Sequence, residues 1–155
     1  MDQKKAAELT QTLEPYTPSQ AVLALELDEL HTFVQSKNHP IWLWVALERE
    51  TRKIVAWVLG DHSNDSFWQL WDALPGDEAS KCQHAYATDA WRSYDNLPQA
   101  RRTTCKGETN HVERWFGTLR SKLGRVVRRS YSFSKSRDML EAALTVFIAG
   151  YNASR

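Results

Sequence analysis

Residues 21–60 read AVLALELDELHTFVQSKNHPIWLWVALERETRKIVAWVLG, and this stretch decides the fold. Its apolar segments are short, rich in β-branched and aromatic residues, and separated by turn-forming segments, which predicts consecutive strands. The first strand is expected to end between Asp28 and Leu30, the second to cover 41–48 and the third to cover 53–60. QSKNHP and RETRK supply the turns between them. We therefore expect an antiparallel three-stranded meander.

Beyond residue 60 the pattern changes to helices that alternate with short strands. Ser63 or Asn64 begins an amphipathic helix, and HAYATD at 84–89 and ARRTTC at 100–105 predict a fourth and a fifth strand. A helix that carries Glu113 and a last helix that starts at 133–136 complete the chain. Three antiparallel strands followed by alternating helices and strands indicate an α/β class fold, the ribonuclease-H-like mixed sheet with helices on its faces. Residues 1–20 are expected to be a lead-in segment and residues 21–155 one domain.

Composition points to a globular protein with a strongly uneven charge. Hydrophobic residues make up 42% and aromatic residues 11% of the chain, which is typical of a folded domain. No apolar run approaches the roughly 20 residues that span a bilayer, and no signal peptide is recognisable, so we expect a cytoplasmic protein without a membrane partner. The net charge of +1 hides a net of −7 over residues 1–100 and +9 over 101–137. This basic segment favours a polyanionic partner such as a phosphate backbone.

Three acids fall at topologically related positions: Asp28 at the end of the first strand, Asp89 at the end of the fourth, and Glu113 on the following helix. In the predicted fold the first and fourth strands are neighbours, so Asp28 and Asp89 would lie side by side and the helix could place Glu113 over them. Converging carboxylates repel one another unless a cation is present. A pair of Mg²⁺ or Mn²⁺ ions, about 3.5–4 Å apart, would suit such oxygen ligands and catalyse phosphoryl transfer.

Each acid also has a simpler interpretation. Asp28 could be a turn residue, Asp89 a helix cap, and Glu113 an ion-pair partner of a neighbouring arginine. Glu26 and Glu29 flank Asp28, and Glu26 lies on the same face of the strand, so strand periodicity leaves Glu26 as an alternative to Asp28.

At these residues the chain resembles the catalytic part of transposases of the bacterial insertion-sequence-1 family, members of the DDE recombinase group. The resemblance covers roughly residues 24–151. It rests on the order and spacing of LELDELHTFV, WLWVALERETRKIVAWVLG, ATDAWRSY, TNHVERWFGTLRSKLGRV and SFSKS. It implies that Asp28, Asp89 and Glu113 form a metal-binding catalytic triad. It also implies cleavage at the ends of an insertion sequence and strand transfer into target DNA.

The same resemblance identifies DNA as the partner. It implies that Arg120 contacts DNA near the cleaved phosphate and that Asn110 is a polar residue of the same motif. With the surrounding basic residues, the candidate DNA-binding set is Asn110, Arg114, Arg120, Lys122, Arg125, Arg128 and Arg129.

Family members carry an N-terminal zinc-finger and helix-turn-helix region, which residues 1–20 are too short to form, so the chain is expected to be the catalytic portion. It would work as a homo-oligomer, or with a full-length or upstream-frame transposase product, and associate with the nucleoid when acting. Two alternatives stay open: a non-catalytic DNA-binding or regulatory fragment that associates with full-length transposase, and a ribonuclease-H-like nuclease or resolvase.

Overall fold

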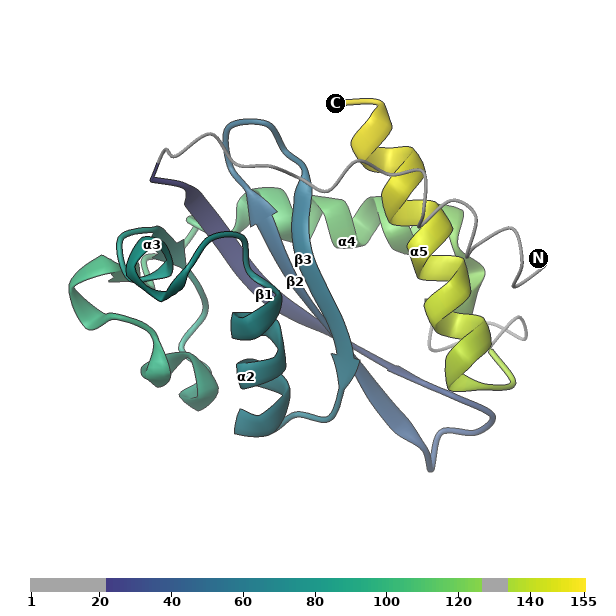
Figure 1. The fold of residues 1–155 in the computed structure, drawn as a ribbon. Coiled ribbons are helices and arrows are strands. Elements are labelled where there is room, and N and C mark those ends of the chain that lie inside the picture. Colours follow the sequence, from purple (N-terminus) through teal and green to yellow (C-terminus); the bar gives the residue numbers. More distant parts are fainter. Residues whose placement is uncertain (1–21, 127–133) are drawn as a thin grey trace.

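The structure is a computed structural model that describes residues 22–126 and 134–155. The chain forms a mixed α/β fold around one five-stranded sheet (Figure 1). The predicted lead-in segment lies outside the described residues. The elements, in chain order, are β1 (Ala24–Phe33), β2 (Pro40–Glu48), β3 (Ile54–Gly60), α2 (Asn64–Ala73), α3 (Glu78–Lys81), β4 (Ala85–Ala87), β5 (Arg102–Thr103), α4 (Asn110–Lys122) and α5 (Arg137–Ala153), with 3₁₀ turns at Arg92–Asn96, Gln99–Arg101 and Gly124–Val126.

The strand order in the sheet is β3-β2-β1-β4-β5. The first three strands form the predicted antiparallel meander, and β4 pairs in parallel with β1 and with β5. The predicted neighbourhood of the first and fourth strands is therefore confirmed. The tight turns between the meander strands contain Gln35 and Arg52, both with positive φ.

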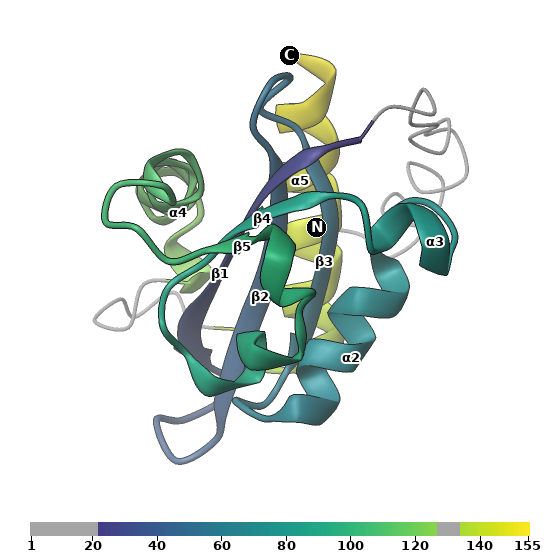
Figure 2. The same ribbon diagram turned by 90° about the vertical axis from the view of Figure 1, so that its left-hand side faces the viewer.

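Helices cover both faces of the sheet, so the domain has two apolar cores. α2 and the 3₁₀ turn after β4 pack on one face against Leu25, Leu27 and Trp44. α4 and α5 pack on the opposite face against Leu43, Val45 and their neighbours. Figure 2 shows α2 and α4 on opposite sides of the sheet. No helix within the described residues combines the length and the apolar character that crossing a membrane requires.

Three strands differ in extent from the prediction, and one of them, β5, covers only Arg102–Thr103 of the predicted 100–105. β1 does not end between Asp28 and Leu30 but continues to Phe33, because β2 pairs with it as far as Pro40 opposite Phe33. β4 is shorter than predicted and ends at Ala87, so Asp89 lies beyond the strand rather than at its last residue. Asp28 therefore lies in the middle of β1, beside the point where the parallel partner strand has ended.

Candidate metal and DNA site

Glu26 fastens the start of α4 to the middle of the sheet. Its carboxylate is fully buried and accepts the backbone N–H groups of His111 and Val112 at 2.9 and 3.0 Å. The other oxygen accepts from Nε of Arg49 at 3.0 Å and contacts the His111 ring. The first turn of a helix has unpaired N–H groups and a partial positive charge, and Glu26 satisfies both from β1. Because every oxygen of Glu26 is engaged, this residue has a structural role, which favours Asp28 among the alternatives on this face.

Glu113 is positioned by the same helix terminus. Val112, Trp115 and Phe116 face the core, whereas Glu113 is exposed in the first turn of α4. The Thr109 hydroxyl donates a hydrogen bond to the Glu113 carboxylate at 2.7 Å. By binding the first turn of α4, Glu26 thus fixes the backbone position from which the Glu113 side chain extends.

Asp28, Glu29 and Asp89 form the acidic cluster of the site. One oxygen from each carboxylate lies within 4.8 Å of the others. The parallel register explains why Asp28 and Asp89 lie close together. Glu26 of β1 pairs with Ala87 of β4, and Asp28 and Asp89 each follow two residues later. The Asp89 side chain accepts the backbone N–H of Trp91 at 2.9 Å, which holds the loop in place.

The sequence prediction and this cluster overlap in part. The structure brings Asp28 and Asp89 together, and it adds Glu29, which the sequence marked only as a neighbour of Asp28. Glu113 is not one of the three clustered acids, but its negative charge contributes to the raised pKa of Asp28. Strand alternation assigns Glu29 to the opposite face from Asp28, and the only sequence signal for Glu29 was an unusual third acid within a largely buried strand.

Burial and like charge shift the acidity of this cluster. Burial, with smaller contributions from the charges of Glu29, Asp89 and Glu113, raises the pKa of Asp28 to about 7, although a hydrogen bond from the Glu29 N–H opposes the shift. The pKa of Glu29 is also raised, mainly by burial, although hydrogen bonds from Tyr94 and His62 oppose the shift. Carboxylates held this close at neutral pH favour a bound cation, which would stabilise their charged forms.

Glu29 is held from behind by two side chains that sequence reasoning did not identify. The buried Tyr94 hydroxyl donates to Glu29 at 2.6 Å, and Nε2 of His62 lies 2.9 Å from its other oxygen. The His62 ring is stacked between Trp42 and Trp91, with ring centroids 3.9 and 3.7 Å away. No motif in the sequence links these residues, because they come from a strand and two separate loops.

The donor set fits a hard divalent cation. All three clustered ligand atoms are carboxylate oxygens, and Mg²⁺ and Mn²⁺ prefer such ligands over the thiolate and imidazole ligands typical of zinc sites. Water and phosphate oxygens would complete the coordination, because the cluster lies at the surface through the exposed Asp89.

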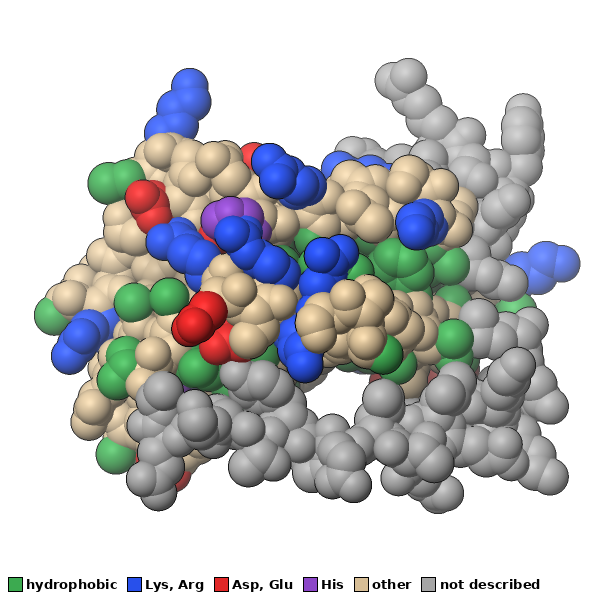
Figure 3. All heavy atoms as spheres, turned by 90° about the horizontal axis from the view of Figure 1, so that it is seen from above, with side chains coloured by type: hydrophobic (Ala, Val, Ile, Leu, Met, Phe, Trp, Pro, Cys, Tyr) green, Lys and Arg blue, Asp and Glu red, His purple; other side chains and the backbone are tan. Residues whose placement is uncertain are grey.

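The candidate DNA-binding residues that the structure describes are exposed on α4. These are Asn110, Arg114, Arg120 and Lys122. The Arg125 side chain, Arg128 and Arg129 lie outside what the structure describes. Figure 3 shows Lys and Arg side chains across the face seen from the top of Figure 1, with few acidic side chains among them. Such a surface attracts a phosphate backbone.

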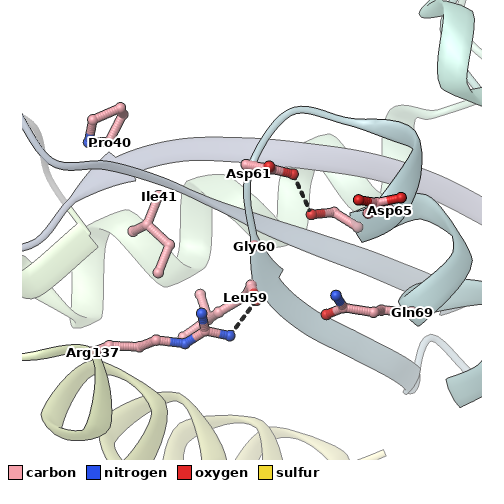
Figure 4. A pocket seen from close by; sticks show the side chains of 9 residues that line it. Pro40, Ile41, Leu59, Gly60, Asp61, Asp65, Gln69 and Arg137 are labelled. Carbon is pink, nitrogen blue, oxygen red and sulfur yellow. Dashed lines mark hydrogen bonds between the residues drawn. The ribbon is translucent and has the colours of Figure 1, made fainter.

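A separate pocket of about 410 Å³ opens between the end of β3 and the starts of α2 and α5 (Figure 4). Arg137 donates to the carbonyl oxygen of Leu59 across it at 2.6 Å, and Ser66 donates to Asp61 at 2.8 Å. Its lining, among the described residues, includes none of the predicted site residues. These bonds join α5 and α2 to the end of β3.

Comparisons with known proteins identify the family of this chain. The model of the IS1 transposase family matches residues 21–152. The InsB protein of insertion element iso-IS1n from Shigella dysenteriae is 31% identical over 127 residues, which is 81% of this chain and 94% of that protein. InsB of IS1 from Shigella flexneri is 30% identical over 119 residues, 76% of this chain and 88% of that protein. InsB of IS1 4 from Escherichia coli K12 is 30% identical over 123 residues, 78% of this chain and 71% of that protein. The chain belongs to the IS1 transposase family.

Proposed function

We propose that residues 21–155 form a ribonuclease-H-like DDE catalytic domain that cleaves DNA at insertion-sequence ends and joins it to target DNA. Membership of the transposase family and the strand order β3-β2-β1-β4-β5 support this assignment. The observation that carries it is the meeting of Asp28 and Asp89, which are far apart in sequence, within reach of the charge of Glu113.

In this proposal Asp28, Asp89 and Glu113 hold divalent metal, with Mg²⁺ or Mn²⁺ as the ion and two ions in the working site. Bound there, the metal would supply Lewis acidity that activates a water or a 3′-hydroxyl and stabilises the leaving oxygen of the phosphodiester. The three carboxylates hold their charged forms when the cation is present, although burial alone favours a protonated Asp28.

The remaining residues of the site orient its parts. Glu26 fixes the start of α4 against β1, so that Glu113 starts from a constant position relative to Asp28. The exposed face of α4 then binds the DNA backbone through Asn110, Arg114, Arg120 and Lys122. Arg125, Arg128 and Arg129 extend this contact in the proposal. Phosphate contacts of this kind fix the register of the duplex but carry no sequence information.

The test is a cleavage and joining assay on duplex DNA that carries the ends of the element encoding this chain, with Mg²⁺ or Mn²⁺. Asp28→Asn, Asp89→Asn and Glu113→Gln should each abolish both steps while the protein keeps its fold by circular dichroism. Glu50→Gln is the matched control, because Glu50 is exposed in the turn after β2 and away from the cluster in the sheet. Full activity in any of the three variants would refute the triad, and cleavage of branched or RNA–DNA substrates without joining would indicate a nuclease instead.

A further inference from the structure

A second cavity lies directly beside the acidic cluster. It measures about 430 Å³, a size in the range of small-molecule sites. His62 and Trp91 form part of its wall, and both also touch the cluster: His62 through its contact with Glu29, and Trp91 through its N–H bond to Asp89. A strand of DNA whose phosphate lies at the carboxylates therefore passes this cavity.

Two rings of an aromatic stack, His62 and Trp91, belong to the wall of the cavity. Trp42, His62 and Trp91 lie nearly parallel, with interplanar angles of 9° and 8°. Among the described residues, the one ring contact of Trp91 is with His62, and Trp91 is partly exposed at the cavity. A flat aromatic ligand placed there would continue the stack.

Hydrogen bonds hold these rings in position before any ligand arrives. The indole N–H of Trp91 donates to the Ser93 hydroxyl at 3.1 Å. The loop that carries His62 is fixed on its other side, because Nε1 of Trp44 donates to the carbonyl oxygen of Asp61 at 2.9 Å. A prebuilt platform lowers the cost of ordering side chains on binding.

The polar residues of the cavity suit a nucleotide. Arg92 is exposed on the rim and has no ion-pair partner among the described residues, so it can meet a phosphate. Asn64 and Asn96 place amide groups in the lining, and the Asn96 side chain donates to the Ser93 carbonyl oxygen at 2.9 Å. Amides bind the edges of bases, and aromatic rings bind their faces irrespective of sequence.

We propose that this cavity binds the unpaired base of a nucleotide next to the phosphate that is cut, stacked on the ring of Trp91. This inference rests on the proposed function, since it takes the acidic cluster as the position of that phosphate. The base leaves the duplex at some energetic cost, and stacking on a fixed indole offsets it. The cavity thus holds the DNA end open at the site of cleavage.

The experiment measures DNA binding without cleavage, by fluorescence anisotropy with Ca²⁺ in place of Mg²⁺. Two duplexes of one sequence are compared, each with one unpaired nucleotide beside the cleavage position. In one this nucleotide carries its base, and in the other it is abasic. We expect the protein to bind the base-carrying duplex about tenfold more tightly, which corresponds to about 1.4 kcal/mol and is within the range for stacking of a base on an aromatic side chain.

Four variants decide the outcome. Trp91→Phe keeps a ring and should keep most of the tenfold preference, whereas Trp91→Leu keeps an apolar side chain against His62 but should bind both duplexes equally. Arg92→Gln should weaken binding to both duplexes alike. Trp68→Ala is the matched control, because Trp68 is 45% exposed on α2 and is not part of the cavity lining.

An unchanged preference in Trp91→Leu would overturn the inference, and so would the absence of any preference in the parent protein. Neither result depends on catalysis. A protein that shows the preference but cuts no DNA would contradict the proposed function and still support the base site. A protein that cuts DNA without the preference would support the proposed function and contradict the base site.

Discussion

Asp28→Asn should stabilise the metal-free protein, and more at high pH than at low pH. The pKa of Asp28 is raised from 3.8 to about 7, so the folded protein binds this proton more tightly than the unfolded chain does. Stability is therefore lost as the pH rises from about 4 to about 7, and the loss is complete above that range. At about 1.36 kcal/mol per pH unit, the penalty is about 2 kcal/mol at pH 5 and about 4 kcal/mol at pH 8. Asparagine has the same shape and no charge, so it escapes this penalty.

The assay is urea unfolding with a chelator at pH 5 and pH 8. The advantage of Asp28→Asn over the parent protein should grow by about 2–3 kcal/mol between the two pH values. Asp72→Asn is the control, because Asp72 is exposed on α2 and its replacement should give no comparable growth. Addition of Mg²⁺ at pH 8 should stabilise the parent protein and have a smaller effect on Asp28→Asn. An advantage of equal size at both pH values would refute the reasoning, because it would mean that Asp28 ionises as freely in the folded protein as in the unfolded chain.

Three further predictions concern the support of the site and its surface. Glu26→Gln removes the buried charge that binds Arg49. It should lower the free energy of unfolding, measured by urea unfolding, by about 2–4 kcal/mol. A loss below about 0.5 kcal/mol would contradict the structural role of Glu26. Gly60→Ala would place a Cβ atom 2.2 Å from the Ser66 hydroxyl oxygen. This substitution should therefore lower the free energy of unfolding by about 1–3 kcal/mol, which would be measured as a lower melting temperature. An unchanged melting temperature would show that the Ser66 side chain moves aside freely. Arg120→Ala should reduce the slope of log Kd for DNA against log salt concentration by about one, and an unchanged slope would exclude Arg120 from phosphate contact.

The sheet could be predicted from sequence where the signal was local. Residues 41–48 and 53–60 form strands because apolar and aromatic runs between turn residues specify them, and the structure confirms both within a residue at each end. The end of β1 and the length of β4 could not be predicted in this way. They depend on which residues find a pairing partner, and the pairing of Phe33 with Pro40 is a property of the hairpin rather than of β1 alone.

The candidate site, like the sheet, could be predicted from the sequence only in part. That Asp28 and Asp89 meet follows from strand order, which the sequence indicated correctly. Strand alternation could not predict that Glu26 has a structural role and Asp28 belongs to the acidic cluster, because both residues lie on the same face of β1. The distinction depends on the backbone of α4, whose N–H groups bind Glu26. His62 lies in a loop without periodicity, so only the folded chain shows that it contacts Glu29.

The parallel pairing of β1 with β4 also sets the order in which the site can assemble during translation. The hairpins of β1, β2 and β3 join neighbouring segments and can close early, whereas contacts between distant segments form slowly. β2, β3 and α2 lie between β1 and β4 in the sequence. Asp28 is therefore synthesised well before Asp89, and the two can come together only after these elements have left the ribosome. A nascent or truncated polypeptide that stops before β4 carries Asp28 and Glu29 but lacks Asp89, so its acidic cluster is incomplete. The dependence on a distant strand thus ties assembly of the acidic cluster to the pairing of β4 with β1.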